Sequence, residues 1–200
     1  MKIVIATKNQ GKLREFKTLL ADLPLTVTSL SDYPAIGEIA ETGSSFADNA
    51  ALKAEAVARQ TGLLTLADDS GLEVDALGGR PGIYSARFAG PGAADQENNA
   101  RLLAELRHVP LPERTARFRS VIALARPGEK TIFVEGICEG LIAERPAGSG
   151  GFGYDPLFFV PAVGQTFAEM PPAVKNKISH RARAMAAARV ILQELLQAEK

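Results

Sequence analysis

Apolar residues follow two patterns along the first part of the chain. Short unbroken apolar runs, which are typical of strands buried on both faces, alternate with segments in which apolar residues recur at the spacing of an amphipathic helix. The helical spacing is clearest at Leu13, Phe16, Leu19 and Leu23, just before Pro24. These patterns predict strands at residues 3–6, 25–30 and 63–67, a helix at 12–23, and a helix from a cap at Ser44 or Ser45 to about Gln60.

The second half of the chain has a different pattern. Two long apolar and β-branched segments flank the turn-forming sequence 126–130, which is typical of a β-hairpin. The predicted elements there are a helix at 93–107, hairpin strands at 117–125 and 131–143, a strand at 157–160 and a final helix at about 179–197. Alternating strands and helices followed by a hairpin predict an α/β fold with a mixed sheet. We expect residues 1–200 to form a single domain with two lobes around one sheet.

Composition and charge narrow the choice of function. Apolar residues make up 46% and charged residues 23% of the chain, and 23 basic residues balance 23 acidic ones. Zero net charge gives no whole-chain argument for binding nucleic acid or a membrane surface, although residues 175–183 form a local basic cluster. A single cysteine, Cys138, excludes an internal disulfide and fits a reducing cytosol, so we expect a cytoplasmic protein.

A polar segment connects the first predicted strand to the following helix. A helix N-terminus offers N–H groups without intrahelical acceptors and the positive end of the helix dipole, so it suits phosphate. The segment is not a P-loop, because Ala6 replaces the leading glycine and Leu13 replaces the Ser or Thr that would bind magnesium. A nucleotide kinase or GTPase is therefore not expected; the alternative to a phosphate site is a polar turn that binds nothing. The segment consists of Thr7, Lys8, Asn9, Gln10, Gly11 and Lys12.

Lys53 lies on the apolar side of the second predicted helix, at helical spacing from Phe46, Ala50 and Val57. Burying an ammonium group without a partner is costly, so we expect an anion beside it. Asn49 lies one turn earlier on the same side. The alternative is a lysine whose head group reaches solvent at the edge of the apolar stripe.

Asp68 and Asp69 follow the third apolar run, and ligands of α/β sheets collect at the carboxyl ends of strands. In an extended chain the two side chains point to opposite faces, so we expect different roles for them. Glu38 and Glu41 in the preceding loop are further candidate ligands, because Mg²⁺ prefers carboxylate oxygens and keeps several waters. The sequence does not separate a metal ligand from a general base among these four, and an Asp turn that closes the strand is the alternative.

Two segments of the C-terminal part are candidate ligand-binding segments. A glycine-rich loop at 148–156 contains Phe152, which a flat base would cover, and Asp155, which can accept hydrogen bonds from ring N–H groups. The alternative is a tight loop in which Phe152 fills the core. A Lys, His and Arg cluster at 175–181 opposes the helix dipole at the start of the final helix, which suggests an acceptor-rich ligand.

The order of these motifs closely resembles the inosine triphosphate pyrophosphatase family, in its bacterial dITP/XTP pyrophosphatase branch. The resemblance covers nearly the whole chain, and Lys8 stands where many members carry glycine. The segments that carry it are 7–12, 41–43, Asn49 with Lys53, 67–72, 79–87, 150–156 and 179–181.

The resemblance implies an elongated α/β fold, in which helices flank a mixed sheet and two lobes enclose a central cleft, and a homodimer. It implies Mg²⁺-dependent hydrolysis of non-standard purine nucleoside triphosphates to the monophosphate and pyrophosphate. It assigns the triphosphate to residues 7–12, the metal to Glu41 and Asp69, and proton acceptance to Asp69. It assigns the base and sugar to Ser70, Phe152, Gly153, Tyr154, Asp155, Lys175, His180 and Arg181.

The working hypothesis is hydrolysis at the α-phosphorus. Asp69 orients or deprotonates a water with the help of Mg²⁺, while Lys12 and Lys53 stabilise charge on the phosphates. Specificity follows from the six-oxo group of XTP, ITP and dITP, which accepts from donors in the loop and at His180 and Arg181. Guanine shares that group, and its rejection needs an element that the sequence does not show.

Two other functions remain open at this point. One is a Maf-like nucleotide pyrophosphatase that prefers other bases. The other is a nucleotide-binding module without catalytic activity, against which the combination of Asp68, Asp69, Lys12 and Lys53 speaks. A panel of substrates with different bases tests the first alternative, and a pyrophosphate-release assay tests the second.

Overall fold

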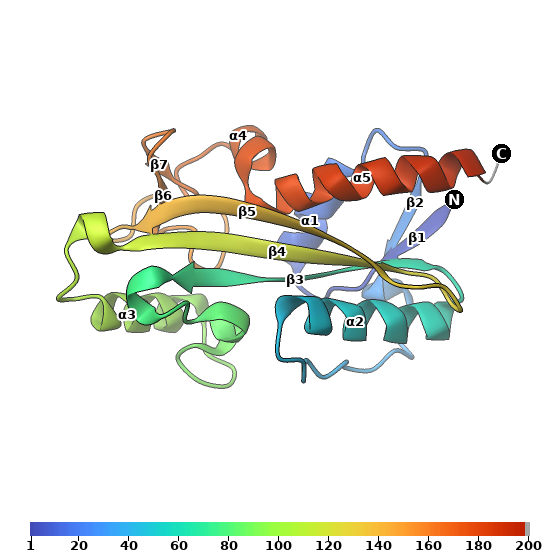
Figure 1. Ribbon diagram of the computed structural model, residues 1–200, viewed down its shortest axis with the longest axis horizontal. Coiled ribbons are helices and arrows are strands. Elements are labelled where there is room, and N and C mark those ends of the chain that lie inside the picture. The colour runs from blue at the N-terminus through green and yellow to red at the C-terminus, as the bar shows by residue number, and fades with distance from the viewer. Residues whose placement is uncertain (199–200) are drawn as a thin grey trace. The chain divides into compact units, whose positions relative to one another are not determined.

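The computed structural model describes residues 1–198 and contains a mixed seven-stranded sheet with helices (Figure 1). The strand order is β2-β1-β3-β4-β5-β6-β7. The strands are β1 (Lys2–Ile5), β2 (Thr26–Ser29), β3 (Leu64–Val74), β4 (Thr115–Ala125), β5 (Ile132–Ile142), β6 (Phe158–Val160) and β7 (Gln165–Thr166). The helices are α1 (Gln10–Leu19), α2 (Phe46–Thr61), α3 (Asp95–Glu105), α4 (Pro172–Ile178) and α5 (His180–Ala198).

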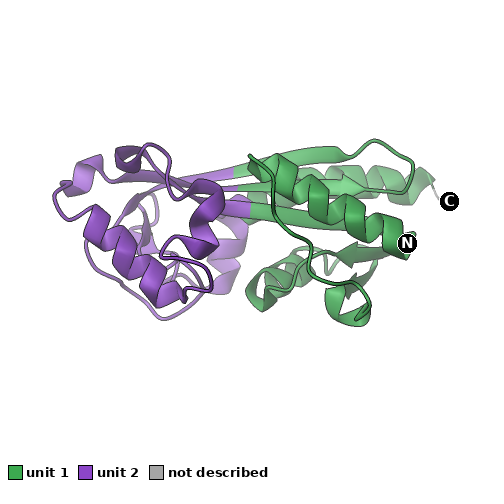
Figure 2. Ribbon diagram, turned by 90° about the horizontal axis from the view of Figure 1, so that it is seen from below, with its two compact units in different colours: residues 1–69, 120–136, 181–200 green, residues 70–119, 137–180 purple. Residues whose placement is uncertain are grey.

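The chain divides into two compact units, which Figure 2 colours separately. Unit 1 comprises residues 1–69, 120–136 and 181–200, and unit 2 comprises residues 70–119 and 137–180. Strands β3, β4 and β5 contribute residues to both units. Each unit has its own cluster of buried apolar side chains. Within the described part of the chain, no helix has both the length and the apolar character that a membrane crossing requires.

Unit 1 is a parallel α/β layer structure. Strand β1 pairs in parallel with β2 on one side and with β3 on the other. Helices α1 and α5 cover one face of these strands and α2 covers the other (Figure 1). The core on the α1 and α5 side includes Phe16, Leu66 and Met185, all fully or almost fully buried. Burial on both faces explains why β1 is an unbroken apolar run in the sequence.

Unit 2 is built around an aromatic cluster. The rings of Phe118, Phe158 and Phe167 lie within 5.7 Å of one another, measured between centroids. Strand β6 pairs antiparallel with the end of β5 and with β7. Helix α3 packs on this cluster through Leu102, and Leu106, which follows the helix, belongs to the same cluster; neither side chain is exposed. The glycine-rich loop 148–156 belongs to this unit.

The structure confirms most predicted elements and corrects two positions. The hairpin strands and the final helix begin and end within two residues of their predicted bounds. Strand β3, however, continues to Val74, so Asp68 and Asp69 lie inside a strand and not at its carboxyl end. Lys175 lies on a separate short helix, α4, and not at the start of the final helix. The sequence analysis also missed strand β7.

Candidate active site

Strand β3 separates the two neighbouring aspartates. Side chains alternate between the faces of a strand, and Leu64 and Leu66 face the core formed with α1 and α5. Asp68 continues that series, whereas Asp69 faces α2, as its contacts show. The predicted separation of the two side chains to opposite faces is therefore confirmed.

Asp68 is the anionic member of a buried ion pair. Its Oδ2 lies 2.7 Å from Lys12 Nζ, and its Oδ1 accepts a hydrogen bond from Ser120 Oγ on β4. Burial alone would raise the pKa of Asp68, but the charges of Lys12 and Arg181 and these hydrogen bonds outweigh burial and hold its pKa well below the usual range. Asp68 is therefore an ionised carboxylate that fixes Lys12.

Helix α1 begins with a side-chain cap. Asn9 Oδ1 accepts a hydrogen bond from the N–H of Lys12 at 3.0 Å, and Thr7 Oγ1 accepts from the N–H of Asn9 at 3.2 Å. The N–H groups of Gln10 and Gly11 in the first turn have no intrahelical acceptor, because no helical carbonyl precedes them. Together with the charge of Lys12, these donors give the predicted segment a geometry that suits an anion.

Asp69 and Lys53 form the centre of a second charged group in unit 1. Lys53 Nζ lies 2.6 Å from Glu41 Oε1, 2.9 Å from the carbonyl oxygen of Asp68 and 3.5 Å from Asp69 Oδ1. Asn49 is fully buried and donates to Asp69 Oδ2 at 3.1 Å. The expectation of an inward-pointing lysine beside an anion is confirmed.

The pKa values of the two aspartates are shifted in opposite directions. Burial raises the pKa of Asp69, with a contribution from Glu41, and the charges of Lys53 and Lys12 only partly offset that effect. The pKa of Lys53 is raised, because Asp69 and Glu41 outweigh the effect of burial. A pair of carboxyl groups with diverging pKa values is typical of acid–base sites.

Glu41 and Asp69 fit a divalent-cation site whose other ligands would come from the substrate. Both carboxylates contact the same ammonium group, so their oxygens already converge on a positive charge. Mg²⁺ is commonly bound by one or two carboxylates together with substrate phosphates and water. A group of three or more potential ligands, which would hold a metal without substrate, does not occur among residues 1–198. Glu38 lies exposed in the loop before Glu41.

A third group of predicted residues lies in unit 2. Lys175 Nζ is 2.6 Å from Asp155 Oδ2, and both residues are buried. The same oxygen accepts from the N–H of Phe152 at 2.9 Å. The ammonium of Lys175 also lies 5.1 Å from the centroid of the Phe152 ring, a cation–π distance. Phe152 itself is half-buried, so its ring is not simply core filling.

The remaining predicted residues have diverse surroundings. His180 is buried in unit 2 and stacks on Phe118, with centroids 4.6 Å apart. Arg181 belongs to unit 1, where its Nε lies 2.5 Å from Glu15 Oε2 on α1. Ser70 is a half-buried residue of β3 at the start of unit 2.

Sequence reasoning missed several partners of these residues. Asp68 is contacted by Ser120, and Arg181 is contacted by Glu15. The backbone of Gly153 is contacted by Asp95 and Asn99. Each partner is far from its residue in sequence, and none belongs to a motif that we singled out. Glu15 alone carried a usable signal, because it follows Lys12 at helical spacing.

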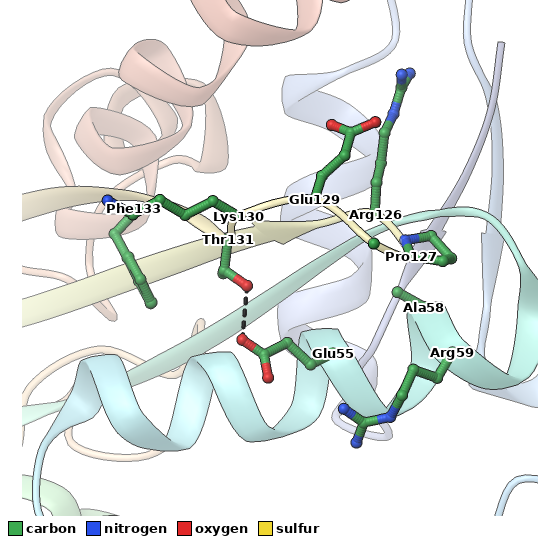
Figure 3. A pocket seen from close by; sticks show the side chains of 10 residues that line it. Glu55, Ala58, Arg59, Arg126, Pro127, Glu129, Lys130, Thr131 and Phe133 are labelled. Carbon is green, nitrogen blue, oxygen red and sulfur yellow. Dashed lines mark hydrogen bonds between the residues drawn. The ribbon is translucent and has the colours of Figure 1, made fainter.

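A cavity of about 460 Å³ also lies in unit 1, between α2 and the turn that joins β4 to β5 (Figure 3). Thr131 Oγ1 donates to Glu55 Oε1 across it at 2.6 Å. Arg126 and Glu129 point away from α2 in Figure 3, and Arg59 points away from the turn. Since these charged groups do not converge and no predicted site residue lines the cavity, it is not a candidate active site.

Comparison with known proteins gives a consistent result. The model of the Ham1 family matches residues 3–190. A dITP/XTP pyrophosphatase of Shouchella clausii is 58% identical over 185 residues, which cover 92% of this chain and 93% of the relative. One of Geobacillus kaustophilus is 57% identical and covers 92% of this chain and 90% of the relative.

Solved structures agree with the fold. A HAM1 protein of Coxiella burnetii has a TM-score of 0.89 at 42% identity, over 97% of this chain and 99% of that one. The Ham1 protein of Staphylococcus aureus has a TM-score of 0.85 at 42% identity, with 100% of both chains covered. The sequence resemblance and the α/β fold with a mixed sheet are therefore confirmed, and the chain belongs to the Ham1 family.

Proposed function

We propose that this protein hydrolyses non-standard purine nucleoside triphosphates, namely XTP, ITP and dITP, to the monophosphate and pyrophosphate. The observation that carries the proposal is geometric: Asp68 pairs with Lys12 at the start of α1, while the neighbouring Asp69 lies beside Lys53, which also contacts Glu41. The names of the relatives, dITP/XTP pyrophosphatase, support the choice of substrate.

Residues 7–12 of unit 1 bind the triphosphate in this proposal. The N–H groups of Gln10 and Gly11 and the ammonium of Lys12 are donors for phosphate oxygens, and Thr7 and Lys8 precede them in the same turn. Asp68 keeps the charge of Lys12 at this helix end. Bound phosphate would place a second anion beside an already paired ammonium, so Lys12 bridges Asp68 and the substrate.

Asp69 accepts the proton of the attacking water. Oxygen of that water bonds to the α-phosphorus, the bond from the α-phosphorus to the bridging oxygen breaks, and pyrophosphate leaves with the electron pair. Asp69 suits this role better than Asp68, because both carboxylate oxygens of Asp68 are engaged, one by Lys12 and the other by Ser120, whereas Asp69 Oδ1 lies 3.5 Å from Lys53 Nζ. Lys53 stabilises charge that develops on the phosphates. Mg²⁺ held by Glu41 and Asp69 would neutralise charge on the triphosphate.

Unit 2 binds the purine and sugar in this proposal. The half-exposed ring of Phe152 stacks on the base, while Gly153 and Tyr154 shape the loop that carries it. Asp155 and Lys175 hold that loop as a buried pair. Donors from this loop, from Ser70 and from His180 favour a six-oxo purine and oppose the six-amino group of adenine. Arg181, the other predicted donor, belongs to unit 1 and pairs with Glu15.

A substrate panel tests the proposal. Pyrophosphate release is measured from ITP, XTP, ATP, dTTP and UTP, each with Mg²⁺ and with excess chelator. We expect release from ITP and XTP only when Mg²⁺ is present. The carboxylates of Glu41 and Asp69 and the ammonium of Lys53 do not by themselves neutralise the negative charge of a triphosphate. Preference for dTTP or UTP would favour the Maf-like alternative. Tight ITP binding without any release would favour the non-catalytic module.

The homodimer and the cytoplasmic location are further parts of the proposal. The single cysteine, Cys138, is buried and cannot form an internal disulfide, which suits a reducing compartment. Sedimentation at micromolar concentration tests the dimer, and a mass equal to one chain would contradict it.

A further inference from the structure

Gly153 is held on both sides by helix α3. Its N–H donates to Asp95 Oδ2 at 2.7 Å, and its carbonyl oxygen accepts from Asn99 Nδ2 at 3.0 Å. Asp95 and Asn99 are one helical turn apart and so share a face of α3. Gly153 has a φ of 61°, a left-handed conformation that the neighbouring Phe152 and Tyr154 do not adopt.

The other residues of the same loop are also fixed. Tyr154 is buried, and its hydroxyl donates to the carbonyl oxygen of Ser85 at 2.8 Å. The N–H of Phe152 donates to Asp155. Because both polar groups of Gly153 are bonded to one rigid element, the peptide planes on either side of it cannot rotate freely. The direction of the Phe152 ring therefore depends on α3.

Helix α3 is itself firmly anchored. Asn98 is buried, accepts from the N–H of Ala89 at 2.7 Å and donates to the carbonyl oxygen of Ala86 at 3.3 Å. Leu102, one turn further along, has no exposed surface. The bonds from Asp95 and Asn99 to the loop thus start from a fixed platform, which positioning of a ligand-binding group requires.

The side chain of Asn99 makes one unfavourable contribution to the stability of the fold. Its Oδ1 is buried and has no hydrogen-bond partner in the described part of the chain. A buried acceptor without a partner is unfavourable, and the opposite orientation of the amide would place Oδ1 against the Gly153 carbonyl oxygen. Such a side chain is better explained by what its Nδ2 group holds than by a contribution to packing.

We propose that Asp95 and Asn99 are positioning residues that fix the Gly153 backbone and thereby present the Phe152 ring to the purine base. This inference rests on the proposed function only in its second half, the stacking of Phe152 on a base. The first half, that α3 holds the loop, concerns the protein without any nucleotide.

Hydrogen exchange tests the first half. Amide exchange of residues 151–155 is measured in the nucleotide-free full chain for wild type, Asp95→Ala and Asn99→Ala. We expect about fivefold faster exchange in both variants, the factor that corresponds to losing one hydrogen bond. Glu97→Ala is the matched control, because Glu97 is the other acidic residue of the first turn and bonds Ala94, not the loop. Equal exchange in all four proteins would overturn the inference.

Kinetics with ITP tests the second half. Asp95→Ala and Asn99→Ala should each raise KM about fivefold with little change in kcat, whereas Asp95→Asn keeps an acceptor oxygen and restores KM. In a Phe152→Ala background, Asn99→Ala should add nothing, because both changes act on the same ring. A further increase in that background, or no KM effect in the single variants, would contradict the inference. A wild type that releases no pyrophosphate would instead contradict the proposed function, and hydrogen exchange would still decide whether α3 holds the loop.

Discussion

Asp68 and Asp69 show how one step along a strand places two carboxyl groups in different surroundings. The strand period places Asp68 against Lys12 and Ser120, and Asp69 against Asn49 and Lys53. Charge pairing keeps the first carboxyl group ionised, whereas burial raises the pKa of the second. The alternation was predictable from sequence, but the partners were not, because they come from α1, α2 and β4.

The Asp68 ion pair makes a prediction about stability. Asp68→Asn should lower the free energy of unfolding at pH 7 by about 3 kcal/mol, because it leaves the mostly buried ammonium of Lys12 without its anion. Urea unfolding measures this. Asp22→Asn is the control: it removes the partner of Arg189 at an exposed position and should change stability little.

The same pair predicts the direction of a pH effect. The folded pKa of Asp68 lies below its unfolded value of about 3.9, so the stabilisation is fully present above that value and is lost as pH falls through the folded pKa. The difference in unfolding free energy between wild type and Asp68→Asn should therefore shrink below about pH 4. A difference that grows on acidification would contradict the assignment of Asp68 as an ionised carboxylate.

The first turn of helix α1 contains a side-chain cap and lies at the proposed phosphate site. Asn9 satisfies the N–H of Lys12, which leaves the preceding N–H groups for a ligand. Asn9→Ala should lower the free energy of unfolding by about 1 kcal/mol, and Asn9→Asp should keep the cap. Because the aspartate adds a negative charge beside the proposed phosphate site, Asn9→Asp should still raise KM for ITP. Urea unfolding measures the change in unfolding free energy, and steady-state kinetics measures KM. An unchanged KM in Asn9→Asp would contradict the assignment of the phosphate to this turn.

At two places the structure shows contacts between distant residues that the sequence patterns could not reveal. The polar residues 68–70 suggested the end of a strand, yet β3 continues because Lys12, Ser120, Asn49 and Lys53 supply partners for the buried carboxylates. The basic cluster near the final helix suggested an acceptor-rich ligand. In the structure Lys175 pairs with Asp155 and Arg181 with Glu15, contacts that connect residues far apart in sequence.

Across the whole molecule, the predicted residues fall into two sets that follow the two units. Unit 1 holds the residues assigned to phosphate, metal and proton transfer, together with Arg181. Unit 2 holds Ser70, the loop with Phe152 and the remaining residues assigned to base and sugar. The sequence predicted the fold class and the chemical character of both sets, because apolar periodicity and motif order are local properties. The residue ranges of the two units follow from packing and could not be derived from these patterns.

Turnover of Asp69→Asn tests the central claim most directly. Pyrophosphate release from ITP with Mg²⁺ is compared between this variant and wild type, and circular dichroism and urea unfolding confirm that both are folded. The proton-acceptor role of Asp69 predicts a loss of kcat of at least about a hundredfold in a folded protein, since the amide cannot take the proton of the attacking water. A folded Asp69→Asn protein with kcat close to wild type would contradict that role and the mechanism built on it.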